Sequence, residues 1–131
     1  MDLKKSKNSS PRIKIIQKLY NALMNPDAVI EYPKSKYKKF IKDVVTGTLE
    51  RSDLIEDQIK SFLTNDIDLF KTDKLLKIIL FAAIFELMFK HNIPKKVIIN
   101  EYLLASEHFL EKIQIGYLNA ILDKISRELR K

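Results

Sequence analysis

The most apolar stretch of the chain lies near its centre, between residues 75 and 89. Its sequence, LLKIILFAAIFELMF, contains only two charged residues, Lys77 and Glu86. As a helix it makes roughly four turns, and a helix that is apolar on all sides must be buried on all sides. It is too short for a membrane span, which needs about 20 apolar residues. The pattern therefore predicts a central core helix around which amphipathic helices pack.

Five other segments carry apolar residues at helical spacing, which predicts amphipathic helices. The first begins at Pro11, where a missing N–H is tolerated, and ends at the Asn25-Pro26-Asp27 break. The expected inward faces of the first two helices are Ile13, Ile16, Leu19, Tyr20 and Leu23, then Tyr37, Phe40, Ile41, Val44 and Val45. The remaining helices are expected near residues 35–47, 52–63, 94–109 and 117–130, with residues 111–116 as a loop.

The composition supports an all-α fold. The chain has two glycines and four prolines and no convincing strand pattern, which disfavours β-sandwiches and glycine-rich loops. The absence of cysteine excludes disulfides and thiolate metal sites. We expect residues 1–10 to form a flexible basic arm and residues 11–131 to form a single all-α domain. Because no apolar run follows the N-terminal lysines, we expect no signal peptide and a cytoplasmic protein.

The positive charge is concentrated in the first third of the chain. Residues 1–42 hold eleven Lys and Arg against three acidic residues, whereas residues 43–131 hold thirteen basic and fourteen acidic residues. The formal net charge of +7 therefore comes from the first third. Such asymmetry points to a polyanionic partner, with nucleic acid favoured over an anionic membrane. The alternative is that the lysines only keep the protein soluble.

No combination of residues indicates catalysis, a metal site or a cofactor site. His91 and His108 lack metal-ligand spacing. Asp66, Asp68 and Asp73 lack the glycine and the distal glutamate that a calcium loop requires. Phosphate-loop, HExxH and nucleophile-elbow motifs are absent from the sequence. We therefore expect a protein that is not an enzyme, with no catalytic residue, metal ligand or cofactor.

Basic and aromatic residues instead indicate RNA binding. Arg12, Lys14 and Lys18 fall outside the apolar stripe of the first helix, so we expect them to form a basic face in water. Tyr20 and Tyr117 can stack on unpaired bases, the alternative being that both are core aromatics. The side chains expected to neutralise phosphates in a salt-sensitive manner are Lys4, Lys5, Lys7, Arg12, Lys14 and Lys18.

Several sequence elements resemble, in the same order, the NusB family of bacterial transcription antitermination factors. Arg12 and the segment IQKLY at 16–20 are similar to that family's R…xQxLY element. Phe85-Glu86-Leu87 is similar to its YEL element. The segment IPKKVIINE at 93–101 resembles iPxxVaINE, and YLNAILDK at 117–124 resembles FVNGVLDK. The matches extend from Arg12 to the C-terminus, and the last two are the more specific.

The resemblance implies a fold of two packed helical subbundles with about six to seven helices. It also implies a role in antitermination at ribosomal RNA operons, in which the protein pairs with the ribosomal protein NusE on single-stranded boxA RNA. The pair then joins the RNA polymerase antitermination complex, with no membrane involved and with the protein itself a monomer or weak homodimer. The RNA side corresponds to the basic arm, the helix of Arg12, and the region around Tyr117 and Asn119.

The chain departs from the family pattern at several positions. Its arm carries lysines where the family often has arginines, and Lys makes fewer planar, bidentate contacts than Arg. Phe81 stands where the family often has an arginine, Ala120 replaces a glycine, and residues 113–116 are IQIG. One alternative is therefore a NusB-like helical protein-interaction domain with weak or non-specific RNA binding. The least favoured alternative is the accessory domain of a ribosomal RNA methyltransferase, because the chain ends soon after the last helix.

Overall fold

The computed structural model describes residues 10–62 and 73–130, which form an all-α fold. Within these ranges the chain has six α-helices and no strand, which confirms the predicted fold class. The helices are α2 (Pro11–Met24), α3 (Lys38–Glu50), α4 (Ser52–Phe62), α6 (Lys74–Phe89), α7 (Lys95–Ser106) and α8 (Lys112–Leu129). The predicted arm at residues 1–10 lies outside the described residues except for Ser10.

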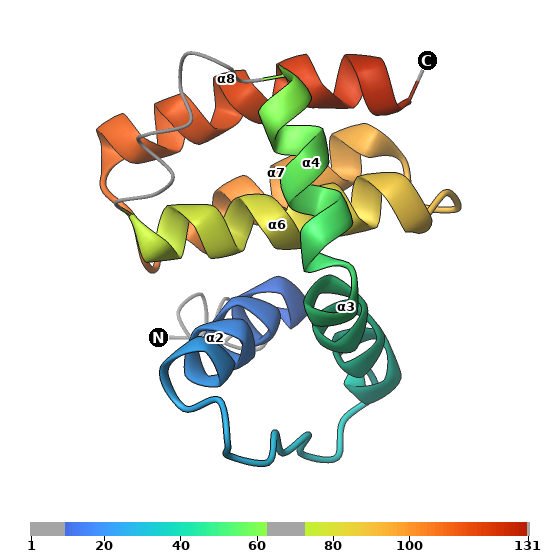
Figure 1. Cartoon of the computed structure of the whole chain (residues 1–131), viewed down its shortest axis with the longest axis vertical. Helices are drawn as coiled ribbons and strands as arrows, with labels where there is room; N and C mark the ends of the chain where they lie inside the picture. The colour runs from blue at the N-terminus through green and yellow to red at the C-terminus, as the bar shows by residue number, and fades with distance from the viewer. Residues whose placement is uncertain (1–9, 63–72, 131) are drawn as a thin grey trace.

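Helix α6 is the predicted central helix and contacts each of the other five (Figure 1). All residues from Ile78 to Leu87 are buried, including Glu86. The helix begins after Asp73, whose side chain accepts a hydrogen bond from the Leu76 backbone N–H at 3.0 Å. None of the helices in the described ranges is long and apolar enough to cross a bilayer.

The other helices form two groups around α6. Helices α2 and α3 pack together on one side of α6 in Figure 1, and α8 lies on the opposite side. Helices α6, α7 and α8 also contact one another in pairs, and α4 crosses α6. This arrangement agrees with the predicted pair of subbundles.

A buried ion pair joins α2 to α6 and α7. The Arg12 guanidinium donates to the Glu86 carboxylate through Nε at 3.1 Å and through Nη2 at 2.6 Å. The Tyr102 hydroxyl donates to the same carboxylate at 2.5 Å. Arg12 Cζ also lies 4.8 Å from the centroid of the Phe40 ring, at the start of α3. One side chain of α2 therefore contacts three other helices.

The prediction that Arg12 lies on a basic face in water is wrong, because its side chain is only 10% exposed. Helix α2 packs against α3 and also against α6 and α7, so its buried stripe is wider than one face. The stripe includes Ile15, which is fully buried, while Tyr20 and Leu23 are 37% and 50% exposed rather than buried. The predicted inward position of Tyr37 is also wrong, since this residue is 41% exposed.

Burial and the neighbouring Glu86 charge shift the pKa values of Arg12 and Tyr102. Burial alone lowers the pKa of the Arg12 guanidinium, but the hydrogen bond and charge of Glu86 raise it above its usual value. Burial, with the charge of Glu86, raises the pKa of the Tyr102 hydroxyl well above its usual value. The phenol therefore stays protonated and continues to donate to Glu86.

The last helix begins earlier than predicted. Residues 111–116 are not a loop, because Glu111 and Gln114 form a capping box and α8 starts at Lys112. The Glu111 backbone N–H donates to the Gln114 side-chain oxygen at 2.9 Å, and the Gln114 amide also donates to Asp73. Gly116 thus lies inside a helix, and the two capping arrangements join the starts of α6 and α8.

The end of α8 closes the end of α6. Arg130 donates to the backbone carbonyls of Leu87 at 2.7 Å, Lys90 at 2.9 Å and Ile93 at 2.9 Å. The last carbonyls of a helix have no intrahelical partner. This guanidinium supplies a donor to the Leu87 carbonyl and a second donor to the Lys90 carbonyl, which also accepts from the Ile93 N–H at 3.0 Å.

Substitution of the two glycines is expected to have opposite effects. In a helix interior, Gly→Ala normally stabilises by roughly 0.5–1 kcal/mol. At Gly47 of α3, however, an added Cβ would overlap the Phe85 ring, whereas at Gly116 nothing lies within 4 Å. We expect Gly47→Ala to destabilise by about 1–3 kcal/mol, as overpacking does, and Gly116→Ala to stabilise. Urea unfolding of both variants measures this; a stable Gly47→Ala would show that α3 and α6 are farther apart.

Removal of one partner of the buried ion pair is expected to be severe. Arg12→Met leaves the Glu86 carboxylate buried without its charge partner, which should reduce the free energy of unfolding by about 3–5 kcal/mol. The matched control is Lys14→Met on the exposed face of the same helix, with a change within about 0.5 kcal/mol. Equal midpoints for the two variants in urea would contradict the buried pair. The triple variant Arg12→Met/Glu86→Leu/Tyr102→Phe, which also removes the hydroxyl that donates to Glu86, should recover much of the loss.

Candidate nucleic-acid interface

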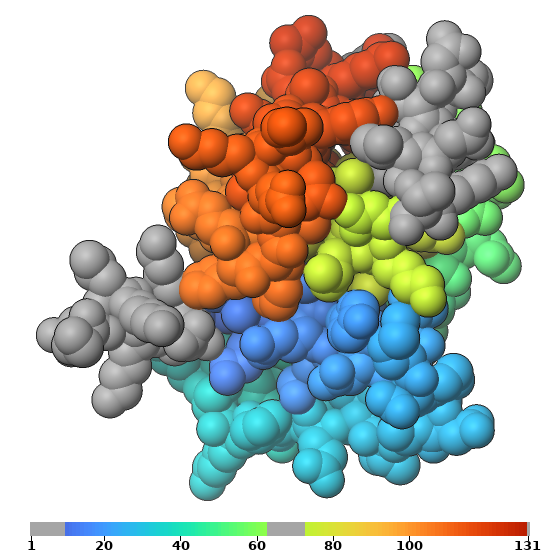
Figure 2. Space-filling model, turned by 90° about the vertical axis from the view of Figure 1, so that its left-hand side faces the viewer, coloured from blue at the N-terminus to red at the C-terminus, as the bar shows by residue number. Residues whose placement is uncertain are grey.

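The exposed face of α2 carries part of the predicted basic surface. Lys14, Gln17, Lys18 and Asn21 recur at three- and four-residue spacing, so they lie on one side of the helix. Lys14 and Gln17 are exposed, and Lys18 is half-buried. Figure 2 shows α2 on one face of the molecule together with the start of α6 and part of α8.

Tyr20 lies at a shallow pocket on this face. The pocket is formed by α2, the start of α6 and the segment before α8, and is lined by Gln17, Lys18, Tyr20, Asn21, Leu75 and Phe109. A tyrosine ring that is partly exposed beside a lysine offers both a stacking surface and a charge for a phosphate. The structure therefore brings together Lys18 and Tyr20 of the predicted RNA-binding residues, and Leu75 and Phe109 form apolar walls beside them.

Tyr117 and Asn119 point to different sides of α8. Residues two positions apart in a helix, such as these, are separated by about 200° around the helix axis. Asn119 is exposed, whereas Tyr117 is half-buried and packs against the hydrophobic core. Of the two roles considered for Tyr117, core packing thus has direct support, while base stacking stays a prediction.

The predicted cationic set is only partly present on the described surface. Lys4, Lys5 and Lys7 lie outside the described residues, and Arg12 is buried in its ion pair. Sequence reasoning left out of the site the exposed lysines of the segment KSKYKKFIK, which are Lys34, Lys36, Lys38, Lys39 and Lys42. The signal was visible in the sequence as five lysines in nine residues.

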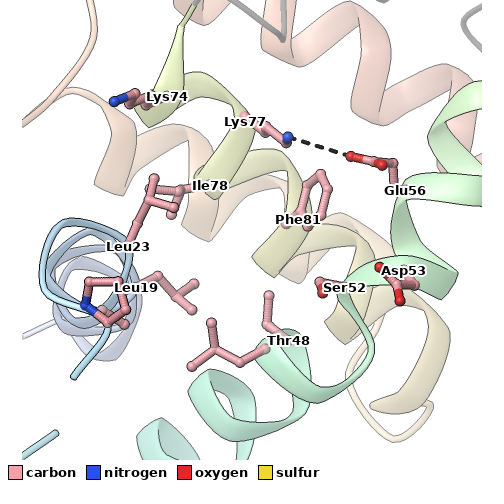
Figure 3. Close-up of a pocket in the computed structure, with 13 residues that line it drawn as sticks. Leu19, Leu23, Thr48, Ser52, Asp53, Glu56, Lys74, Lys77, Ile78 and Phe81 are labelled. Atoms are coloured by element: carbon pink, nitrogen blue, oxygen red, sulfur yellow. Dashed lines mark ion pairs between the residues drawn. The ribbon is translucent and has the colours of Figure 1, made fainter. Parts of the chain in front are cut away.

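A second pocket on the surface is a mainly apolar cleft (Figure 3). This cleft, of about 530 Å³, lies between α2, the α3–α4 corner and α6. Its walls are largely apolar and include Leu23, Leu49 and Phe81, the first two of them 50% and 43% exposed. On its rim, Lys77 Nζ lies 3.4 Å from a Glu56 carboxylate oxygen. The Thr48 hydroxyl, also in the lining, is buried without a hydrogen-bond partner among the described residues.

The site contains no recognisable catalytic or metal-binding arrangement among the described residues. His91 and His108 are both exposed. In residues 10–62 and 73–130, no three His, Asp or Glu side chains are placed to hold a metal ion. What the described surface offers is charge, exposed aromatic rings and an apolar cleft, which are means of binding.

Comparisons with known proteins agree with this picture. The sequence model of the NusB family matches residues 4–127. Transcription antitermination protein NusB of Mesorhizobium japonicum is 34% identical over 92 residues, covering 70% of this chain and 59% of that protein. The protein of the same name from Rickettsia bellii is 33% identical, covering 96% of this chain and 94% of that protein. The chain spans little more than half the length, 52–59%, of several such relatives.

The fold has a counterpart among solved structures. T. maritima NusB superposes with a TM-score of 0.77 at 23% identity, covering 90% of this chain and 89% of that chain. This likeness shows the fold. With the family match across residues 4–127 and relatives above 30% identity, it follows that the chain belongs to the NusB family.

Proposed function

We propose that this protein is a transcription antitermination factor that binds boxA-type single-stranded RNA together with NusE, as part of an RNA polymerase antitermination complex. The observation that carries the proposal is the similarity to Rickettsia bellii transcription antitermination protein NusB over nearly the whole of both chains. The NusB family is one of non-enzymatic factors, which agrees with the binding features of the surface.

The α2 face is the proposed RNA-binding surface. Lys14 and Lys18, on this face, are proposed to neutralise phosphates. The sequence adds Lys4, Lys5 and Lys7, which lie outside the described residues. The Tyr20 ring, open to solvent beside Lys18, is the proposed stacking surface for a base. Asn119, exposed on α8, can donate to and accept from a base edge.

The apolar cleft suits a protein partner better than RNA. Phosphates require uncompensated positive charge, but the two lysines that line the cleft, Lys74 and Lys77, are balanced by two carboxylates in the same lining, Asp53 and Glu56. Exposed leucines beside a buried aromatic wall are typical of the centre of a protein–protein interface. NusE is therefore the proposed occupant.

A second candidate function has support from one observation. Arg12 is committed to Glu86, so the chain has one fewer cation for RNA than its sequence suggested. This favours the alternative of a helical protein-interaction domain that binds RNA weakly. The two candidates differ in whether boxA RNA is bound in preference to a scrambled RNA.

Fluorescence anisotropy with matched and scrambled boxA RNA, with and without NusE, tests the function. We expect the matched RNA to bind more tightly and NusE to strengthen the difference. Tyr20→Ala should weaken binding by about 1–3 kcal/mol with an unchanged salt dependence, because a stacked base is lost. Lys14→Gln/Lys18→Gln should instead lower the slope of log K against log salt by about 1.4, since each phosphate contact contributes about 0.7. Equal affinity for both RNAs would favour the second candidate.

Charged substitutions in the cleft are expected to weaken NusE association and to leave RNA binding unchanged. Leu23→Asp/Leu49→Asp places carboxylates on the apolar wall, so NusE association should weaken at least tenfold in calorimetry. RNA binding by the variant alone should match that of the wild type. Lys14→Gln/Lys18→Gln is the reciprocal control and should leave NusE association intact. Undiminished NusE binding by the leucine variant would place the partner elsewhere.

A further inference from the structure

The strongest concentration of unpaired positive charge on the described surface lies at the start of α3. We call Lys34, Lys36, Lys38, Lys39 and Lys42 the α3 lysine cluster. All five are exposed, and residues 34–42 contain no acidic residue. None of the five forms an ion pair with another described residue. Their charges are therefore available to a polyanion.

These lysines do not serve the stability of the helix. The N-terminal end of a helix carries partial positive charge, so cations there are unfavourable and carboxylates favourable. Helix α4 follows this rule with Asp53 in its first turn. Helix α3 has no acidic residue in its first turn and no side-chain cap, and it begins with Lys38 and Lys39. An external anion at this end would be attracted by the lysines and by the helix together.

The α3 lysine cluster is continuous with the start of α2. Arg12 lies against Phe40, so the first turns of α2 and α3 are neighbours. Farther along, Leu23 of α2 and Leu49 of α3 line the same cleft, so the later turns of the two helices are neighbours as well. The cluster therefore lies at the end of the helix pair where the described chain begins at Ser10.

Aromatic rings accompany these charges. Tyr37 is 41% exposed, and the Lys36 ammonium lies 5.0 Å from its ring centroid. Lys18 of the α2 face lies 5.6 Å from the ring of Tyr32, which connects that face to the segment before α3. Of the nearby carboxylates, Asp43 lies 3.8 Å from Lys90, and Glu31 is exposed on the same connecting segment.

We propose that the α3 lysine cluster binds the phosphates of single-stranded RNA flanking the element held by the α2 face, with Tyr37 as a stacking surface. The inference rests on the proposed function and extends it to a second RNA-binding surface. RNA fits better than an anionic membrane, because a membrane-surface helix needs an exposed apolar face, and here Ile41 is buried and Phe40 half-buried. Lysines alternating with an exposed tyrosine are instead the composition of a single-strand groove.

The test compares a short RNA limited to the boxA element with a longer RNA that adds flanking nucleotides. Wild-type protein should bind the longer RNA more tightly and with a steeper salt dependence. Lys36→Gln/Lys38→Gln/Lys39→Gln should abolish this gain and lower the slope for the longer RNA by about 2, since three contacts contribute about 0.7 each. Binding to the short RNA should be unchanged. The matched control, Lys95→Gln/Lys96→Gln/Lys124→Gln, removes the same charge from α7 and α8 and should keep the gain.

The outcomes separate the inference from the function on which it rests. An unchanged slope and length dependence in the triple variant would overturn the inference, while a preference of the wild type for matched boxA RNA would leave the function standing. An equal loss in the control variant would overturn it as well, because net charge alone would then explain the effect. The inference would also be overturned if the triple variant lost binding to phosphatidylserine vesicles but kept its RNA binding, because the cluster would then bind a membrane. The melting temperature of the triple variant should equal or exceed that of the wild type. Lys34→Gln/Lys42→Gln, outside the first turn of α3, is a second variant. It should lower the slope of log K against log salt by about 1.4.

Discussion

The ion pair between Arg12 and Glu86 is the interaction on which the rest of the structure depends. Glu86 is fully buried in the last turn of a helix that every other described helix contacts. A buried carboxylate without partners is unfavourable by several kcal/mol, so α6 can occupy the centre only when other helices supply those partners. Helix α2 supplies the arginine and α7 the tyrosine hydroxyl. The pair, with the tyrosine hydroxyl, therefore favours one alignment of α2 and α7 against α6.

The same constraint divides the positive charge of the chain between structure and surface. The arginine at the start of α2 is used internally, and the exposed cations of α2 and α3 are lysines. Lysine is a compact, flexible point charge, whereas arginine makes planar, bidentate contacts. The described part of the proposed RNA-binding surface would therefore attract phosphates with little geometric selection, and we expect selectivity to come from the aromatic and amide side chains between the lysines.

The fold was largely predictable, because the apolar period of each segment is long and regular. The burial of residues 78–87 and the inward positions of α8, such as Leu118 and Ile125, follow directly from that period. The start of α8 at Lys112 was missed, because residues 111–116 were predicted to be a loop, although the sequence contains the Glu111 and Gln114 of the capping box. The site was less predictable. A helical period assumes one buried face, whereas α2 is covered on several sides, so Arg12 could not be assigned from spacing alone.

The contacts of Arg130 have a consequence for the mobility of two helix ends. The carbonyls of Leu87 and Lys90, at the end of α6, receive a donor from a residue about 40 positions later in the sequence. Arg130 follows the last turn of α8, and the ends of helices usually fray. Fraying there would return the Leu87 carbonyl to water, so we expect the end of α8 and the end of α6 to open together.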